Sequence, residues 1–418
     1  MEVAALPIDP ASEEEKMKFL FMLQRVTEEL SKLIPITEDE DKIHQQLQGV
    51  RRKHHSVFEV LARGIANFYS EFFRHQHRWV ERAVAGNEEG VTVCRYGFKY
   101  LLVMMRIDED QVFKITIDFF HYYVGAYLEQ QVRGEGNFGG MGYGPKGPSL
   151  EQSYGDIFKE VMKMVCLKMA KPEEVLIVID EDGTPVREEV ENTENSSLYE
   201  IEKELAQFLV RYNWPDMKKF ILGEIEKQQN VDFFSFDRLN SLSWIVGSLC
   251  GSIQDREERS FFINTLRTLL QLCEIKKGKE NKAVIASCIM YVVGQYPTFL
   301  RHNWTFLKTV IKKLFEFMRE DYPGIMEMAC NAFLKIARST ADQFVGVQQN
   351  ETEPYIREII RRAPDHIRRL HPETLQYTFY ESMGYFIAAE GVAEVQVQLM
   401  KEVLGQLLFE FGQIINMA

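Results

Sequence analysis

Residues 272–318, LCEIKKGKENKAVIASCIMYVVGQYPTFLRHNWTFLKTVIKKLFEFM, decide the fold class of this chain. Their apolar residues recur at spacings of three and four, which is the pattern of amphipathic helices rather than of strands. Gly278 and Pro297 interrupt the pattern at points where a helix can end or begin. The stretch therefore predicts consecutive helices joined by short loops.

The same pattern extends outward over most of the 418 residues. Antiparallel helix pairs that recur about every 40–47 residues are typical of HEAT and armadillo arrays. We therefore predict an all-α fold, a HEAT-repeat α-solenoid built from antiparallel helix pairs. The repeats share a pattern rather than letters, so a non-repeating helical fold stays open. The predicted helices span 12–33, 50–84, 90–106, 109–131, 151–170, 198–211, 215–229, 235–252, 256–275, 280–296, 300–319, 323–345, 352–368, 372–388 and 392–415.

Two segments break the helical pattern. The glycine-rich stretch 134–148 contains a lysine but no Gly-Lys-Ser/Thr sequence, which favours a flexible loop over a phosphate loop. Around Asp182-Gly183, the sequences VLIVID and PVREEV flank a strong hairpin-turn signal. An acidic β-hairpin insertion over 174–197 is predicted to project from the array, with a merely solvated excursion as the alternative. The predicted sections are 1–150 with the glycine-rich loop, 151–254 with the hairpin, 255–346 with the groove described below, and 347–418.

Composition excludes several classes of protein. The net charge of −13 argues against a general nucleic-acid coat, which requires a basic surface. The six cysteines lack Cys-x-x-Cys spacing and indicate reduced thiols rather than a disulfide framework or a metal site. No apolar run approaches the ~18 residues of a membrane span, and the acidic N-terminus is no signal peptide. No nucleophile elbow, catalytic triad or apolar carboxylate pair is visible, so we expect neither an enzyme nor a cofactor.

The helices predicted at 256–275 and 300–319 are apolar around more of their circumference than packing requires. Two adjoining stripes on the first cover roughly 200° of the helical wheel, whereas packing needs a stripe of about 100°. As first members of consecutive pairs, the two helices would lie side by side, with their surplus edges facing across a shallow channel. The alternative is that neighbouring repeats bury both helices on two sides. The second stripe of the first helix is Ile263, Leu266, Leu270 and Cys273, and the surplus edge of the second helix is Phe306, Val310 and Phe317.

Basic residues gather around this predicted channel. Residues 260–320 hold ten Lys or Arg against four acids, inside a chain that is acidic as a whole. A basic rim around an apolar slot suits an amphipathic peptide with hydrophobic anchors and acidic flanks. Cys273 lies on the channel edge beside the lysines of 276–282, where cations favour the reactive thiolate. An inert core thiol is the alternative.

The stretch 272–318 resembles the exportin family of karyopherins. MAKPEEVLIV (169–178), SLSWIVGSLCGSI (241–253) and TFYESMGYFIAAE (378–390) resemble the same family. The resemblance is strong over about 150–390 and weaker but collinear over 12–130. It implies a nuclear export receptor that shuttles between nucleus and cytoplasm and binds cargo through leucine-rich export-signal peptides. Ran-GTP and nuclear pore proteins are the further implied partners; no nucleic acid, no membrane and no oligomer are expected. Family members are far longer, so the chain is expected to be a central piece of one.

The resemblance also implies roles for individual residues. The export-signal peptide would bind between the outer helices 256–275 and 300–319, and Cys273 corresponds to the cysteine that lactone-type covalent export inhibitors modify. The hairpin resembles an acidic loop that contacts Ran. Without Ran, this loop crosses the inner surface behind the groove and favours its closure; Ran displaces the loop, so that cargo and Ran bind with reciprocal positive cooperativity. The implied groove floor is Leu266, Leu270, Cys273, Ala286, Met290, Phe299, Phe306, Val310 and Phe317, and the implied rim is Arg267, Lys279, Lys282 and Lys313. The implied Ran-contacting residues are Asp180, Glu181, Asp182, Glu188 and Glu189.

A generic HEAT-repeat scaffold is the alternative function. Such a scaffold would present a flat binding face instead of a peptide groove. The two functions differ in whether apolar side chains remain accessible between helices 256–275 and 300–319.

Overall fold

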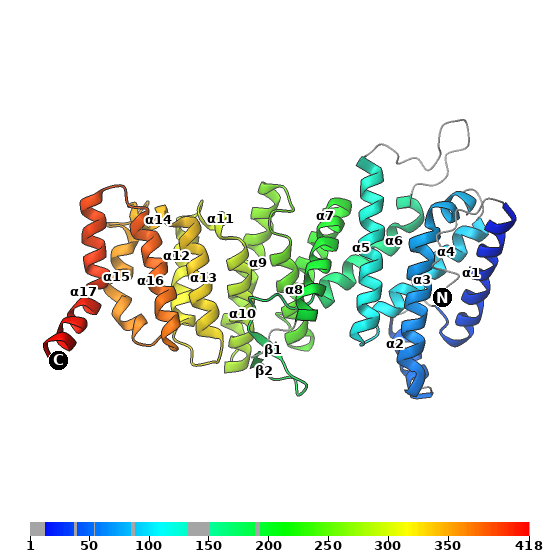
Figure 1. The fold of residues 1–418 in the computed structure, drawn as a ribbon, viewed down its shortest axis with the longest axis horizontal. Helices are drawn as coiled ribbons and strands as arrows, with labels where there is room; N and C mark the ends of the chain where they lie inside the picture. Colours follow the sequence, from blue (N-terminus) through cyan, green and yellow to red (C-terminus); the bar gives the residue numbers. More distant parts are fainter. Residues whose placement is uncertain are drawn as a thin grey trace. The chain divides into compact units, whose positions relative to one another are not determined.

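A computed structural model shows an almost entirely helical chain (Figure 1) and describes residues 13–36, 40–53, 55–84, 88–132, 150–188 and 193–417. Over these residues the elements are α-helices, apart from one short 3-10 helix and one two-stranded hairpin. The predicted all-α class with a single β-hairpin is therefore confirmed. Among the described helices, none has the apolar length that a bilayer crossing demands. The predicted glycine-rich loop at 134–148 lies outside the described residues.

The chain forms two compact units. The first comprises residues 1–168 and 197–217, and the second comprises 169–196 and 218–418. Helix α7 (Thr193–Lys227) contributes residues to both units.

Helix α7 is interrupted close to the change of unit. Asn213 has non-helical backbone angles (φ −156°, ψ 77°) two residues before Pro215. Proline has no N–H for the helical ladder and clashes with the preceding turn. The Asn213 side chain accepts the backbone N–H of Asp216 at 3.1 Å and so caps the following segment. This break agrees with the separate helices predicted at 198–211 and 215–229.

Aromatic side chains form the core of the first unit. Phe73 of α3 stacks on Phe98 of α4 with ring centroids 4.3 Å apart, and Phe98 contacts Tyr123 of α5 at 5.1 Å. A Cβ at Gly97 would lie 2.7 Å from the Phe73 ring, so glycine is required for α3 and α4 to approach this closely. The helices of this unit are α1 (Glu13–Leu33), α2 (Glu40–Lys53), α3 (His55–Val84), α4 (Glu88–Met105), α5 (Asp110–Val132), α6 (Leu150–Lys168) and the first part of α7.

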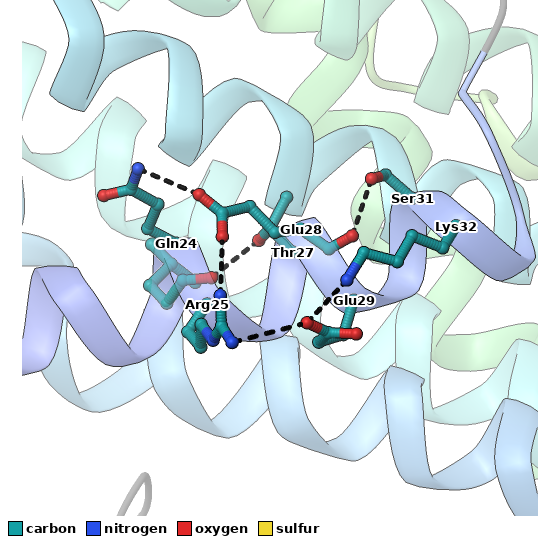
Figure 2. A network of polar contacts seen from close by, with 8 residues as sticks. Gln24, Arg25, Thr27, Glu28, Glu29, Ser31 and Lys32 are labelled. Carbon is teal, nitrogen blue, oxygen red and sulfur yellow. Dashed lines mark hydrogen bonds and ion pairs between the residues drawn. The ribbon is translucent and has the colours of Figure 1, made fainter.

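The solvent side of α1 carries a network of polar side chains, which Figure 2 shows. Glu28 accepts from Gln24 at 3.1 Å, and Glu29 pairs with Lys32 at 2.8 Å. These side chains are exposed, so each pair contributes little to stability. On the other side of the helix, the buried Thr27 hydroxyl lies 2.9 Å from that of Tyr69 on α3. The helix is therefore amphipathic, with a solvated face and a face in the core.

The second unit consists of helix pairs in two rows. Helices α8, α10, α13 and α16 pack against one another in succession, and α9, α12 and α15 pack on α10, α13 and α16 respectively. This is the arrangement predicted from the repeat period. The helices are α8 (Phe236–Ser248), α9 (Asp255–Ile275), α10 (Lys279–Gln295), α11 (Pro297–Leu300), α12 (Trp304–Phe317), α13 (Ile325–Thr340), α14 (Asp342–Val345), α15 (Tyr355–Ile367), α16 (Glu373–Ala388) and α17 (Ala393–Met417). The remaining elements are the 3-10 helix η1 (Val231–Phe233) and strands β1 (Ile177–Ile179) and β2 (Pro185–Arg187).

Ion pairs connect each repeat of this unit to the next. They join side chains 41 to 45 positions apart, close to one repeat length. Most are partly exposed, so they position neighbouring repeats more than they stabilise them. The pairs are Arg301–Asp342 at 2.8 Å, Lys308–Glu351 at 2.7 Å, Arg338–Glu381 at 2.7 Å and Arg357–Glu402 at 2.6 Å.

Some predicted boundaries are wrong. The helix predicted at 300–319 begins four residues later, as α12 at Trp304, because the Asn303 side chain accepts the backbone N–H of Phe306 at 3.1 Å and caps its start. The helix predicted at 323–345 is α13 followed by α14. Residues 40–49, which were predicted to lie outside a helix, belong to α2.

A buried histidine makes the stability of the second unit depend on pH. His366 of α15 is 3% exposed and lies against Phe315, with ring centroids 4.6 Å apart. Its Nδ1 has no hydrogen-bond partner among the described residues. Burial, together with the charges of Arg319 and Arg362, lowers the pKa of His366 from 6.5 to about 4. The folded state therefore favours neutral imidazole.

We expect the free energy of unfolding to decrease as the pH falls from 6.5 towards 4, by up to about 3 kcal/mol from this group. Between those values the unfolded chain binds a proton that the folded chain does not, so acid favours unfolding. Urea unfolding at a series of pH values measures the effect. His366→Leu should flatten the profile in this window, whereas His302→Gln, at an exposed position, should not. An unchanged slope in His366→Leu would contradict the assignment.

Candidate functional site

The predicted channel lies between α9 and α12 of consecutive repeats. Asp255 and Glu257 in the first turn of α9 favour its start, because acids interact well with a helix N-terminus. The Phe262 ring of α9 lies 6.3 Å from that of Phe306 on α12 and 6.5 Å from that of Phe299 on α11, centroid to centroid. The three rings join the two helices at the N-terminal end of the channel.

The predicted floor divides into a fully buried layer and a half-buried layer. Most of the predicted floor is therefore covered by the protein's own side chains, and four of its positions keep partial exposure. The buried residues are Leu266, Ala286, Met290, Val310 and Phe317, each at most 2% exposed. The half-buried residues are Leu270, Cys273, Phe299 and Phe306.

The four predicted rim cations differ in their partners. Lys282 pairs with Glu320, and Lys313 pairs with Glu316 at 2.6 Å while lying 5.9 Å from the Phe317 ring centroid. Arg267 and Lys279 are exposed and make no ion pair with any described residue. The four predicted rim residues are basic, but two of them, Lys282 and Lys313, already pair with Glu320 and Glu316. The Glu316 pair is local to α12, three positions apart, whereas the Glu320 pair depends on the approach of α10 to the end of α12 and could not be predicted from adjacent residues.

Burial, not the neighbouring lysines, governs the ionisation of Cys273. Burial raises the pKa of its thiol, while the charges of Lys313 and Lys282 lower it by less. The two lysine charges favour thiolate, as expected of nearby cations, but burial opposes them with a larger effect, so the thiol form is favoured. A half-buried thiol beside two cations is still open to a reagent that fits the channel.

The hairpin has the predicted turn. Strands β1 and β2 pair antiparallel, with Ile177 opposite Arg187. Gly183 adopts a positive φ of 78°, which only glycine adopts without strain. The Asp180 carboxylate accepts the backbone N–H of Thr184 at 2.7 Å and so holds the turn closed. The Asp-Gly signal in the sequence correctly predicts this turn.

The strands of the hairpin dock on the inner row of helices, while its tip at 180–184 is exposed. Both strands pack on α10, as Figure 1 indicates. Arg187 pairs with Glu327 of α13 at 3.0 Å, and the Tyr322 hydroxyl donates to the carbonyl of Pro185. At the base of the hairpin, Glu174 accepts from Lys335 of α13 at 3.1 Å. The predicted projection therefore holds for the tip alone, because buried Val175, Ile177 and Pro185 give the rest of the hairpin an apolar side that the helices cover.

The acidic residues of the hairpin fall into two groups. Asp180, Glu181 and Asp182 are exposed at its tip. Glu188 pairs with Lys171 at 2.5 Å near the base. Glu189 lies outside the described residues. The tip therefore presents three carboxylates to solvent.

The sequence pattern does not indicate the residues on which the hairpin docks. Gly324, Tyr322 and Glu327 hold it, and they lie more than 130 positions away along the chain. Gly324 begins α13 with a positive φ of 87°, and a Cβ there would lie 3.1 Å from Ile177. The one signal in the sequence was a Pro-Gly pair before a helix, which marks a turn but not what docks on it.

Two family models match the chain. "CRM1 / Exportin repeat 2" covers residues 150–217, and "CRM1 / Exportin repeat 3" covers residues 230–280. The second match includes all of α9, one wall of the channel.

Curated relatives match over most of the chain. It is 35% identical over 374 residues to Protein EXPORTIN 1A of Arabidopsis thaliana, covering 86% of this chain and 34% of that protein. It is 37% identical over 369 residues to Exportin-1 of Drosophila melanogaster, covering 85% of this chain and 33% of that protein. The chain thus spans about a third of the length of these relatives.

A solved structure of importin beta shares the fold. The TM-score is 0.50 at 11% sequence identity, covering 88% of this chain and 39% of that one. This likeness supports the α-solenoid architecture alone.

We expect Gly324→Ala to loosen the hairpin and to lower the free energy of unfolding by about 1–3 kcal/mol, because alanine is strained at this φ and its Cβ meets Ile177. Urea unfolding and limited proteolysis at the hairpin measure the two effects. Gly384→Ala is the matched control, since nothing lies within 4 Å of a Cβ in α16; it should stabilise by about 1 kcal/mol. Equal protection of the hairpin in both variants would contradict its docking on Gly324.

Alkylation of Cys273 should follow a pH profile that Lys313 shifts. In Lys313→Met the profile should move to higher pH, because the lysine charge lowers the pKa of the thiol. Rates of iodoacetamide labelling, located by peptide mass spectrometry, measure it. Lys312→Met, at an exposed neighbour that does not act on Cys273, should leave the profile unchanged. A shift to lower pH in Lys313→Met would show that the assigned electrostatics are wrong.

Proposed function

Because this chain belongs to the exportin family of nuclear transport receptors, we propose that it forms the part of an export receptor that binds leucine-rich export-signal peptides. The peptide binds between α9 and α12. The observation that carries this proposal is the row of half-buried apolar side chains above a fully buried floor, bordered by lysines. The receptor binds and carries cargo and catalyses no reaction.

The channel suits a peptide with spaced apolar side chains. Leu270 and Cys273 are three positions apart on α9 and therefore share one side of that helix. Phe306 on the opposite wall is also half-buried, but it lies near the start of α12 beside Phe262, so it would contact a different peptide side chain from Leu270 and Cys273. Burying one leucine side chain contributes about 1.5–3 kcal/mol, and ordering the peptide offsets part of that. Several anchors are therefore needed for measurable affinity.

The rim suits acidic flanks on the peptide. The exposed Arg267 and Lys279 make no ion pair among the described residues, and Lys282 and Lys313 can exchange partly exposed ion pairs for pairs with a ligand. Exposed ion pairs contribute at most about 1 kcal/mol, so exchanging one for another costs little. These charges would favour encounter and orientation more than affinity.

The hairpin would couple the groove to Ran-GTP. It docks on α10 and α13, and these helices carry α9 and α12, the walls of the channel. A partner that engages Asp180, Glu181 and Asp182 at the tip can withdraw the hairpin, because the ion pairs holding it are partly exposed. Release would let α10 and α13 shift and widen the channel, so peptide and Ran-GTP would each strengthen binding of the other. Transit through nuclear pore proteins and shuttling between nucleus and cytoplasm belong to the same proposal.

A fluorescent leucine-rich peptide should lose at least tenfold in affinity to Leu270→Ser or Phe306→Ser, because each removes an apolar contact of about 1.4 kcal/mol or more. Both positions are half-buried, so the fold should persist, and circular dichroism checks this. Val347→Ser, which alters a side chain 62% exposed away from the channel, is the control and should bind like the parent. Equal affinity in all variants would support the generic scaffold instead.

The double variant Lys279→Glu and Lys313→Glu should weaken peptide binding less than Phe306→Ser does, and should flatten its dependence on salt. Long-range attraction between rim and peptide is screened by salt, whereas apolar contact is not. Fluorescence anisotropy at several ionic strengths measures both quantities. An unchanged salt slope would eliminate the basic rim from the proposal while leaving the groove intact.

A further inference from the structure

Strand β2 and the residue before it have the sequence Thr184-Pro185-Val186-Arg187. A threonine followed directly by proline, with a cation three positions after it, is the pattern that cyclin-dependent protein kinases phosphorylate. The 418 residues contain 13 prolines, and Pro185 is the only one that follows a serine or a threonine. The pattern therefore singles out one hydroxyl group of this chain, that of Thr184.

The Thr184 hydroxyl lies at the surface of the hairpin tip. Its side chain is exposed, and the hydroxyl makes no hydrogen bond with any residue that the structure describes. The backbone of Thr184 is held instead. Its N–H donates to the Asp180 carboxylate at 2.7 Å, and its carbonyl accepts from the N–H of Asp180 at 3.0 Å. The turn thus fixes the backbone and leaves the hydroxyl accessible to a reagent.

The two neighbours of Thr184 that such a kinase recognises are already engaged within the protein. Pro185 is buried, and its carbonyl accepts a hydrogen bond from the Tyr322 hydroxyl. Arg187 pairs with Glu327 of α13 at 3.0 Å. A kinase would have to bind the same proline and the same guanidinium group. Docking of the hairpin and binding of the kinase therefore compete.

The contacts that hold these two residues can open without unfolding the helices. The side chains of Arg187 and Glu327 are 39% and 34% exposed, so their ion pair contributes little to stability. Each strand of the hairpin is only three residues long. Local opening of such a segment costs less free energy than global unfolding. It would expose Pro185 and Arg187 together, which is the state that a kinase can bind.

A phosphate on Thr184 would enter acidic surroundings when the hairpin docks again. Burial, followed by the charges of Glu280 on α10 and of Asp180, raises the pKa of the Tyr322 hydroxyl, so both carboxylates lie near this group. Lys279, next to Glu280 in the sequence, offers a single cation against them. A phosphothreonine carries about −1.5 to −2 charges at neutral pH and disrupts packing beside acids by repulsion. The phosphate therefore hinders the return of the hairpin to the helices.

We propose that Thr184 is a phosphorylation site for a proline-directed protein kinase that binds the undocked hairpin, and that the phosphate keeps the hairpin from docking on α10 and α13. In this step Oγ1 of Thr184 attacks the γ-phosphorus of ATP, its proton passes to the catalytic aspartate of the kinase, and ADP leaves. The site lies on the hairpin and not in the channel, so the proposal does not rest on export-signal binding.

Incubation of the chain with a cyclin-dependent kinase, ATP and Mg²⁺, followed by peptide mass spectrometry, tests the site. Thr184 should be phosphorylated. The double variant Tyr322→Phe, Glu327→Gln loosens docking and leaves the recognised residues intact, so its initial rate should be at least fivefold higher. Glu381→Gln is the matched control, because it removes an ion pair of α13 that does not involve the hairpin, and it should leave the rate unchanged. An unchanged circular dichroism spectrum checks that each variant folds.

A further variant separates kinase recognition from loosening of the hairpin. Arg187→Gln breaks the same ion pair as Glu327→Gln, yet it should lower the rate of phosphorylation at least fivefold, because the kinase loses the cation that it recognises. A rate in Arg187→Gln as high as in Glu327→Gln would overturn the assignment of this site to a kinase that recognises the cation.

Limited proteolysis measures the effect of the phosphate on docking. Phosphorylation should raise the rate of cleavage within the hairpin at least threefold, whereas Thr184→Ala treated with the kinase should be cleaved like the unmodified parent. Absence of phosphate on Thr184 in both the parent and the double variant would overturn the proposal. Equal rates of phosphorylation in the double variant and in Glu381→Gln, or unchanged cleavage after phosphorylation, would also overturn it.

Discussion

Helix α10 is buried along its whole central length, and the arrangement of the second unit follows from that constraint. Every residue from Ala283 to Gly294 is covered. A helix in the middle of a two-row array meets α8 and α13 within its own row and α9 in the other row, which leaves one side to cover. The hairpin covers that side with β1 and β2. Because α10 is apolar on all sides, the array requires such a cover, and the hairpin supplies it.

The same constraint links the two surfaces of the array. Ala286 and Met290 of α10 lie under the channel, while the strands of the hairpin pack on the same helix. Packed interiors have little free volume, so a shift of α10 on the hairpin side also displaces the side chains packed on its other side. The hairpin is held by a small apolar contact through Ile177 and Pro185, together with partly exposed ion pairs and one tyrosine hydrogen bond. It packs on α10 over fewer residues than α8 or α13 does, so it is the most easily displaced of these neighbours.

Sequence patterns predict what is local and miss what depends on distant partners. Apolar periodicity gave the helix rows, and Asp182-Gly183 gave the hairpin turn, because spacing and backbone preference are properties of a few adjacent residues. The start of α12 was missed by four residues because Asn303 caps it, a signal weaker than the apolar pattern that ran through it. The docking of the hairpin on Gly324 and the coverage of Phe317 could not be predicted, since each requires residues from separate repeats to meet. The apolar surplus on α9 and α12 could not tell which of these side chains neighbouring helices bury and which stay half-buried, because that depends on residues of other repeats.

Cys273 and the exposed arginines that follow α12 and α15 (Arg319, Arg368 and Arg369) show the same competition between burial and charge with opposite outcomes. At Cys273, two lysines lie near a half-buried thiol. Burial raises the pKa of this thiol by more than the lysine charges lower it. At the ends of α12 and α15 the guanidinium groups stay in water, so no burial opposes them and their charges act outward. Helix α12 borders both places: Lys313 faces the channel, and Arg319, a turn and a half further on, faces α15. Lys313 lies within α12 and Arg319 two residues beyond its end, so partly buried and exposed cations follow one another within six residues of the chain.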